Sequence, residues 1–168
     1  MKDLEECIQS ISYKHFFIQD DIQNQPAYIV ATNGQFEVIN HTKKDIRFLQ
    51  IDDCIKFDND DKKCDCAVYN DDIFCFIEQK SMSSQKPSTI AKRRKNAEKQ
   101  LKYTILNFKE NQIVKNKKLE AYVSITCNHD SKLTRITNVR NQNAIVEFED
   151  NYNVNLYYEC KKEFIRIK

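Results

Sequence analysis

The chain has 168 residues, of which 40% are hydrophobic, and its 27 Lys and Arg nearly balance 25 Asp and Glu. This length and apolar content suit a single domain over residues 1–168 and argue against a disordered chain. No segment approaches the roughly 20 apolar residues of a membrane-spanning helix, and the opening MKDLEECIQS lacks the apolar region of a signal peptide. We therefore expect a cytoplasmic protein that makes no membrane contact.

The N-terminal third favours one helix followed by short strands. Leu4, Ile8 and Ile11 lie near helical spacing, which predicts an amphipathic helix over residues 2–17. The segments with β character that follow are 27–32, 35–39 and 47–51. Asn33-Gly34 between the first two predicts a hairpin. Because the chain has one Gly and two Pro, we expect its other turns to use Asn and Asp, and the acidic stretch 58–61 to form a loop.

The centre of the chain predicts a hairpin, a long helix and another strand. Residues 64–69 and 73–79 have strand character, and residues 119–126 form a further expected strand. Ser88 or Thr89 can cap a helix that runs to about Glu110. The apolar stripe of this helix is Ile90, Ala97, Leu101, Ile105 and Phe108.

The remainder of the chain predicts a β-rich C-terminal tail. Residues 144–148 and 156–158 are strand candidates, followed by a last strand or short helix that ends at Lys168. The alternation of strands and helices indicates an α/β (α+β) fold, with a mixed central β-sheet flanked by helices.

Cysteines offer a competing hypothesis, because four of the seven fall between residues 54 and 75. The spacing lacks the Cys-x2-Cys pairs that are typical of structural zinc sites, and no His completes such a pattern. We therefore expect free thiols that behave as small buried hydrophobes, in a reducing compartment.

A tight turn at residues 71 and 72 fixes how the central hairpin pairs. It places residue 69 opposite 74, residue 67 opposite 76 and residue 65 opposite 78. Because side chains alternate between faces, Asp65, Glu78 and Lys80 would share one face. The other face would be wholly apolar and carry Cys64, Cys66, Val68, Ile73, Cys75 and Ile77. A three-residue loop would instead set Asp65 opposite Ile77 and separate the acids.

Two carboxylates one strand apart repel each other unless a cation lies between them. Oxygen ligands of this kind suit Mg²⁺ or Mn²⁺. A neighbouring lysine can position a water molecule and stabilise the negative charge that develops on a phosphoryl group. The ordinary alternative is a set of surface salt bridges, which contribute little to stability.

Asp65, twelve residues and then Glu78-x-Lys80 on an apolar hairpin resembles the PD-(D/E)xK nuclease superfamily, with a match over roughly residues 60–126. The resemblance implies a restriction-endonuclease-like core and Mg²⁺- or Mn²⁺-dependent cleavage of DNA rather than RNA, in restriction or in defence against mobile DNA. Asp65 and Glu78 would bind the metal and Lys80 would act in catalysis. Cys64 replaces a frequent Pro of the pattern.

The resemblance also implies additional site residues from other parts of the chain. Many members add an upstream acid, for which Glu5 and Glu6 are candidates. Some members carry Gln-x3-Tyr on the following helix. Here Gln100 and Tyr103 are only three positions apart, so Gln100 alone carries over as a catalytic candidate.

Charge is unevenly distributed around this motif. Residues 52–72 carry eight Asp against three Lys, whereas residues 86–102 carry seven Lys or Arg against one acid. The basic side chains predicted to contact phosphates are Lys92, Arg93, Arg94, Lys95 and Lys99. The alternative is a solvated helix face. For the whole protein, the alternative to a nuclease is an inactive nuclease-like scaffold that binds nucleic acid or a protein. A homodimer or a partner protein is compatible with either.

Overall fold

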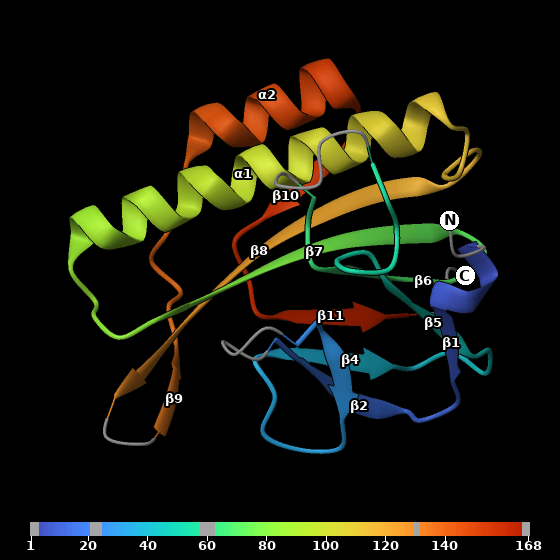
Figure 1. Cartoon of the computed structure of the whole chain (residues 1–168), viewed down its shortest axis with the longest axis horizontal. Helices are drawn as coiled ribbons and strands as arrows, with labels where there is room; N and C mark the ends of the chain where they lie inside the picture. The colour runs from blue at the N-terminus through green and yellow to red at the C-terminus, as the bar shows by residue number, and fades with distance from the viewer. Residues whose placement is uncertain (1–3, 21–24, 58–62, 130–131, 166–168) are drawn as a thin grey trace.

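The computed structural model describes residues 4–20, 25–57, 63–129 and 132–165. The predicted acidic loop at 58–61 and the end of the chain at 166–168 lie outside these residues. Two helices, a large mixed sheet and a smaller sheet form three layers (Figure 1). No described helix is both long and apolar enough to cross a membrane.

The large sheet is ordered β1-β5-β6-β7-β8-β10, with β9 paired to β8. Its strands are β1 (Ile8–Ile11), β5 (Ile46–Gln50), β6 (Cys66–Tyr69), β7 (Ile73–Met82), β8 (Lys118–His129), β9 (Lys132–Arg135) and β10 (Asn155–Tyr157). Strands β5, β6 and β7 form an antiparallel meander. Strand β8 runs parallel to β7 and β10 runs parallel to β8.

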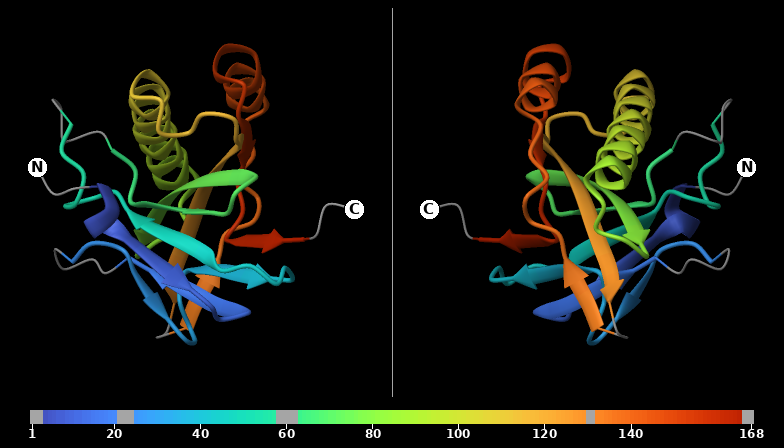
Figure 2. Two further views of the ribbon diagram at one scale, coloured as in Figure 1. Left: turned by 90° about the vertical axis from the view of Figure 1, so that its right-hand side faces the viewer. Right: turned by 90° about the vertical axis from the view of Figure 1, so that its left-hand side faces the viewer.

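Helix α1 (Pro87–Glu110) connects β7 to β8, and α2 (Gln142–Tyr152) precedes β10. Both helices lie side by side on one face of the large sheet (Figure 2). The predicted stripe of α1 is confirmed, because Ala97, Leu101, Ile105 and Phe108 are buried and Ile90 is partly buried. The predicted cap is wrong, since the helix begins at Pro87 without a side-chain cap. Proline suits a first helical position because the backbone N–H that it lacks has no partner there.

The small sheet covers the opposite face of the large one, and its strand order is β11-β4-β2-β3. Its strands are β2 (His15–Gln19), β3 (Tyr28–Val30), β4 (Phe36–Asn40) and β11 (Lys161–Phe164). As a result, β6 and β7 are buried on both faces. Ala67 and Phe76 pack toward the helices, whereas Val68 and Ile77 pack toward the small sheet.

The hairpin register predicted from alternation is confirmed. Ala67 lies opposite Phe76, and Tyr69 lies opposite Phe74. One assignment of faces is wrong, because Cys64 belongs to the helix-side core rather than to the face that carries Val68. The reason is that Cys64 precedes the first residue of β6, so strand alternation does not extend to it.

The predicted N-terminal helix is also wrong. Residues 4–11 form the short 3-10 helix η1 (Leu4–Cys7) and then β1, and β2 follows from His15. Along β2, Phe16 and Ile18 are buried while Phe17 and Gln19 are partly exposed. This alternation has the strand period of two, and pairing with β5 and β4 outweighs the helical spacing of the apolar residues.

The strands beside Asn33-Gly34 form, but the predicted hairpin between them is wrong. Strands β3 and β4 each pair with β2, which lies between them. Asn33 rather than Gly34 takes the left-handed conformation, with φ of 60°. Position 34 requires glycine for a steric reason instead, because a Cβ there would lie 2.5 Å from the Cβ of Phe17.

Two further expectations need correction. Residues 144–148 lie in α2 rather than in a strand, with Ala144 and Phe148 buried one helical turn apart. A short apolar run does not by itself distinguish helix from strand. Cys7 and Cys54 form a disulfide across 47 positions of sequence, so these two are not free thiols. The prediction of buried free thiols is confirmed for Cys64, Cys66 and Cys75 and for the two other free cysteines, Cys127 and Cys160.

Candidate active site

Asp65 and Glu78 meet at the point where β6 begins. The ladder between β6 and β7 starts with Cys66 opposite Ile77, and the two acids lie one step beyond it. The Asp65 N–H donates to Glu78 Oε2 at 3.2 Å, and the Gln79 N–H donates to Asp65 Oδ2 at 2.5 Å. Each carboxylate is therefore held by a backbone amide of the neighbouring segment. Glu78 is fully buried and Asp65 is 7% exposed.

Lys80 completes the predicted cluster. It lies two residues after Glu78 on β7, and its Nζ contacts Glu78 Oε1. Burial lowers the pKa of Lys80, but the charges of Glu78 and Asp65 outweigh burial and raise that pKa above its usual value. The lysine therefore stays protonated while it faces the two acids. The structure thus brings together the three residues of the motif.

The two carboxyl groups lie in an environment that disfavours their ionised forms. Burial raises the pKa of Glu78 to about 7, although Lys80 acts to lower it. Burial and the charge of Glu78 raise the pKa of Asp65 well above its usual range. A cation bound between the groups would reverse this preference, because it favours the ionised forms.

Asp20 and Asp52 are acids near this site that the sequence analysis missed. The charge of Asp20, directly after β2, raises the pKa values of Asp65 and Glu78. Burial raises the pKa of Asp52, and Lys80 is close enough to act against this rise. Asp20 follows an alternating segment, which could have indicated that it ends a strand. It lies 45 positions before Asp65, however, and nothing in the sequence relates the two residues.

Glu5 and Glu6 are not brought to this site. Both are exposed on η1, and Glu5 lines a shallow pocket with Arg47 and Tyr69. Tyr69 is the last residue of β6, so this pocket lies toward the end of the strand away from Asp65. Among the described acids, Asp20 is therefore a better candidate than either for the upstream position.

Gln100 supports the segment that leads into Asp65 rather than touching the carboxylates. Its Nε2 donates to the backbone oxygen of Lys63 at 2.9 Å. One turn further along α1, Thr104 Oγ1 accepts from the N–H of Cys64 at 2.8 Å. These two contacts from α1 fix the backbone immediately before Asp65. Gln100 is thus a positioning residue in this structure.

Gln79, between Glu78 and Lys80, points to the opposite face of β7. Its Nε2 donates to the backbone oxygen of Ile18 at 3.3 Å and to Gln35 Oε1 at 3.2 Å. Gln35 Oε1 also accepts from the Asp20 N–H at 3.0 Å. This buried amide pair connects β7 to the small sheet, and it also contacts Asp20.

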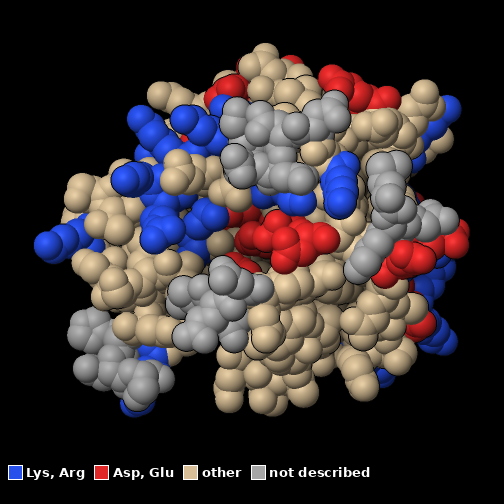
Figure 3. All heavy atoms as spheres, in the orientation of Figure 1, with Lys and Arg blue, Asp and Glu red and all other residues tan. Residues whose placement is uncertain are grey.

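Four of the five predicted phosphate-binding residues are available to solvent. Lys92, Arg93, Lys95 and Lys99 are exposed on α1. Arg94 is instead half-buried and pairs with Glu98, with 3.4 Å between Arg94 Nε and Glu98 Oε1. Figure 3 shows Lys and Arg side chains gathered over the N-terminal half of α1, beside an acidic patch at the centre of the same face.

The donors at the motif suit a magnesium-type ion. Within the described part of the chain, no group of three or more His, Cys, Asp or Glu side chains is arranged to hold a metal. Magnesium, however, is commonly bound through one or two carboxylates, with waters and substrate phosphate completing its shell. Asp65 and Glu78 provide two such carboxylates, and both are oxygen donors.

Comparisons of the chain with protein-family models, curated proteins and solved structures found no match.

We expect the metal-free protein to lose stability as the pH rises from about 5 to about 8. The pKa of Glu78 is raised from 4.5 to about 7, so the folded chain binds this proton more tightly than the unfolded chain does. The resulting stability is fully present below the unfolded pKa and is lost as pH rises through about 7, by at most roughly 3 kcal/mol. Urea unfolding in EDTA across this range measures it.

Glu78→Gln is the matched control for this pH effect, because glutamine keeps the shape of the side chain without a titrating proton. Its stability should vary less with pH than that of the wild type. Equal slopes in the two proteins would show that Glu78 does not carry the effect.

Proposed function

We propose that the chain is a metal-dependent phosphodiesterase of nuclease type that acts on DNA. The observation that carries the proposal is the buried convergence of Asp65, Glu78 and Lys80 at the open end of the β6–β7 hairpin. The antiparallel meander β5-β6-β7, followed by α1 and a parallel β8, supports a restriction-endonuclease-like core.

Each residue of the motif has a distinct role in this proposal. Asp65 and Glu78 would hold Mg²⁺ or Mn²⁺, which would supply a Lewis acid and lower the pKa of a water molecule. The Lys80 ammonium group donates hydrogen bonds toward the attacked phosphate and stabilises the negative charge that develops there. Gln100 keeps the backbone before Asp65 in place through Lys63.

The exposed basic residues of α1 provide the DNA contacts in this proposal. Lys92, Arg93, Lys95 and Lys99 would bind backbone phosphates, which orients a duplex or a strand without reading its sequence. Arg94 contributes less, because Glu98 already pairs with it. A role in restriction or in defence against mobile DNA follows from the resemblance to the nuclease superfamily.

One observation favours the alternative of an inactive scaffold. Lys80 contacts Glu78 directly, and backbone amides occupy one oxygen of each carboxylate. A cluster of this kind can satisfy its own charges without a metal ion. The scaffold hypothesis predicts no Mn²⁺ binding that depends on Asp65.

Cleavage of DNA in the presence of Mg²⁺ or Mn²⁺ tests the proposal. Supercoiled plasmid, linear duplex and single-stranded DNA are each incubated with the wild type and with Asp65→Asn. We expect the wild type to cut at least one substrate about 100-fold faster or more than Asp65→Asn, because the variant removes a metal-binding charge. Asp150→Asn, at an exposed position on α2, should cut like the wild type.

If the wild type cuts none of the three substrates faster than Asp65→Asn, the nuclease proposal fails. Calorimetric titration with Mn²⁺ then separates the two hypotheses further, since the scaffold predicts no difference between the wild type and Asp65→Asn.

A further inference from the structure

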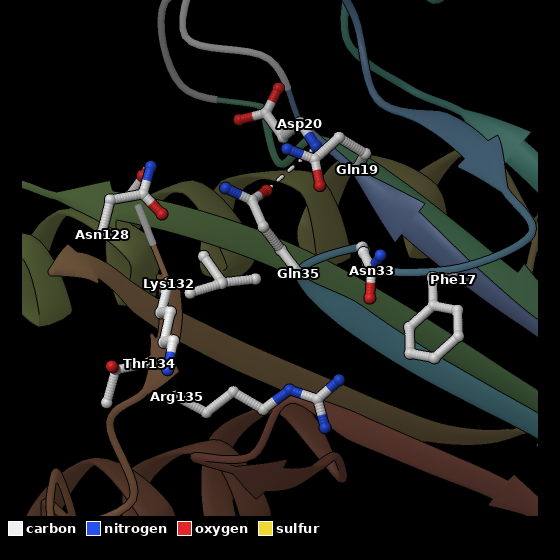
Figure 4. A pocket seen from close by; sticks show the side chains of 12 residues that line it. Phe17, Gln19, Asp20, Asn33, Gln35, Asn128, Lys132, Thr134 and Arg135 are labelled. Carbon is white, nitrogen blue, oxygen red and sulfur yellow. Dashed lines mark hydrogen bonds between the residues drawn. The ribbon is translucent and has the colours of Figure 1, made fainter. Parts of the chain in front are cut away.

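Ser81, the residue after Lys80, lines a pocket of about 970 Å³. It lies between the small sheet and the β8–β9 hairpin (Figure 4). The end of β2 contributes Phe17 and Asp20, the approach to β4 contributes Gln35, and β9 contributes Thr134 and Arg135. The motif residues Asp65, Glu78 and Lys80 do not line it, so it is a separate feature of the molecule.

Two polar groups of this pocket have hydrogen-bonding capacity to spare. Gln35 is 3% exposed, and its Oε1 already accepts from Asp20 and Gln79. Its Nε2 donates to no described residue and is directed away from Asp20, toward the side of Asn128 (Figure 4). Ser81 Oγ is also buried and has no hydrogen-bond partner among the described residues. The pocket therefore offers an amide donor and a hydroxyl group that have no partner among the described residues.

The walls add aromatic, amide and cationic groups. The ring of Phe17 lies on one side, and Asn33 and Asn128 present further amides. Lys132 and Arg135 supply positive charge, and Arg135 also donates to Glu37 at 3.3 Å. This set of groups can bind an unpaired nucleotide. The base of a nucleotide forms hydrogen bonds and stacks on aromatic rings, and its phosphate pairs with cationic side chains.

The pocket and the motif lie next to each other along β7, since Ser81 lines the pocket and Lys80 belongs to the motif. Beyond Ile77, the described part of β7 pairs only with β8, because β6 begins at Cys66. Lys80 and Ser81 are consecutive and face opposite sides of β7. Asp20 lines the pocket and also acts electrostatically on Asp65 and Glu78. Glu78 and Gln79 are buried, whereas Lys80 and Ser81 are partly exposed. A DNA strand that lies over this later part of β7 can reach both sides.

We propose that this pocket binds an unpaired base of the DNA strand, so that the adjoining phosphodiester lies over Lys80. The inference rests on the proposed action on DNA, and it adds that the substrate is single-stranded or locally unpaired at the cut. The volume suits the assignment, because small-molecule sites commonly measure about 300–1,000 Å³.

Binding without cleavage tests the inference. Lys80→Ala protein in EDTA is titrated with three fluorescently labelled oligonucleotides, namely a single strand, the same strand with central abasic sites, and the duplex. We expect the intact single strand to bind about tenfold more tightly than the abasic strand, since contacts to one base contribute roughly 1–3 kcal/mol. Adding Thr134→Phe, which fills the pocket from an exposed position on β9, should remove this preference.

Thr137→Phe in the same Lys80→Ala protein is the matched control, because Thr137 is exposed and does not line the pocket. It should keep the preference for the intact strand. If Thr134→Phe lowers the melting temperature, Asn128→Leu removes a pocket amide at another exposed position and should weaken single-strand binding. The inference is overturned if the abasic strand binds as well as the intact one, or if the folded pocket variants bind like the control.

The two proposals fail in different ways. A wild type that never cuts DNA but shows base-dependent binding that Thr134→Phe removes would sink the nuclease proposal and leave the base pocket. A wild type that cuts DNA while Thr134→Phe changes no binding would sink the base pocket alone.

Discussion

Lys80→Ala should reduce metal-dependent DNA cleavage by about 10²–10⁴-fold, the range typical of removing a group that transfers or stabilises charge in the transition state. Lys80 is the positively charged member of the motif, and its Nζ contacts the buried Glu78 carboxylate. In the proposed mechanism, loss of the amine removes the cation that would face the attacked phosphate. Initial rates of cleavage under saturating Mn²⁺ measure the effect.

Lys99→Ala is the matched control, because this lysine is exposed on α1 and is not among the groups that act on Asp65 or Glu78. We expect a change of only a few-fold for it, and mainly in the apparent affinity for DNA, since one phosphate contact is lost. A catalytic role for Lys80 would be refuted by a folded Lys80→Ala protein that cuts within about tenfold of the wild-type rate.

Glu120→Leu should destabilise the protein by about 3–5 kcal/mol, because it leaves a buried lysine without its carboxylate. Glu120 on β8 is 3% exposed and Lys162 on β11 is 8% exposed. Lys162 Nζ donates to Glu120 Oε2 at 2.5 Å, and the hydroxyl of Tyr122 donates to the same oxygen at 2.8 Å. This ion pair connects the large sheet to the small sheet. Urea unfolding at neutral pH measures the loss.

The double variant Glu120→Leu with Lys162→Met distinguishes the uncompensated charge from lost packing. Replacing both members of a buried pair by apolar residues is often close to neutral, so the double variant should recover most of the lost stability. A double variant as unstable as Glu120→Leu would show that the lysine charge is not the cause. Lys161→Met, at the neighbouring position with an accessible side chain, should change stability little.

The motif could be predicted from the sequence because it depends on local pairing. One turn at residues 71 and 72 and the alternation of side chains sufficed to place Asp65 opposite Glu78, and the first ladder pair at Cys66 and Ile77 agrees with that register. The stripe of α1 was predictable for a similar reason, since its period lies within one helix.

Features that depend on contacts between distant segments could not be predicted from the sequence. Asp20 approaches the motif only because β2 inserts between β3 and β4, and no local pattern encodes that choice of partners. The disulfide between Cys7 and Cys54 likewise depends on where η1 and the loop after β5 meet. Apolar residues near Ile8 and Phe148 fit either period over a few positions, so tertiary pairing decided between helix and strand.

Strand β7 constrains how this region of the gene can change in length. Its ten residues pair continuously with β8, from Ile73 opposite Lys118 to Met82 opposite Cys127. One inserted or deleted codon before Glu78 would turn Glu78 and Lys80 toward the small sheet and turn Gln79 and Ser81 toward the helices. Both the acid pair and the pocket would be lost in a single event. We expect related sequences to vary here by substitution and to place length changes in the exposed polar connection at 83–86.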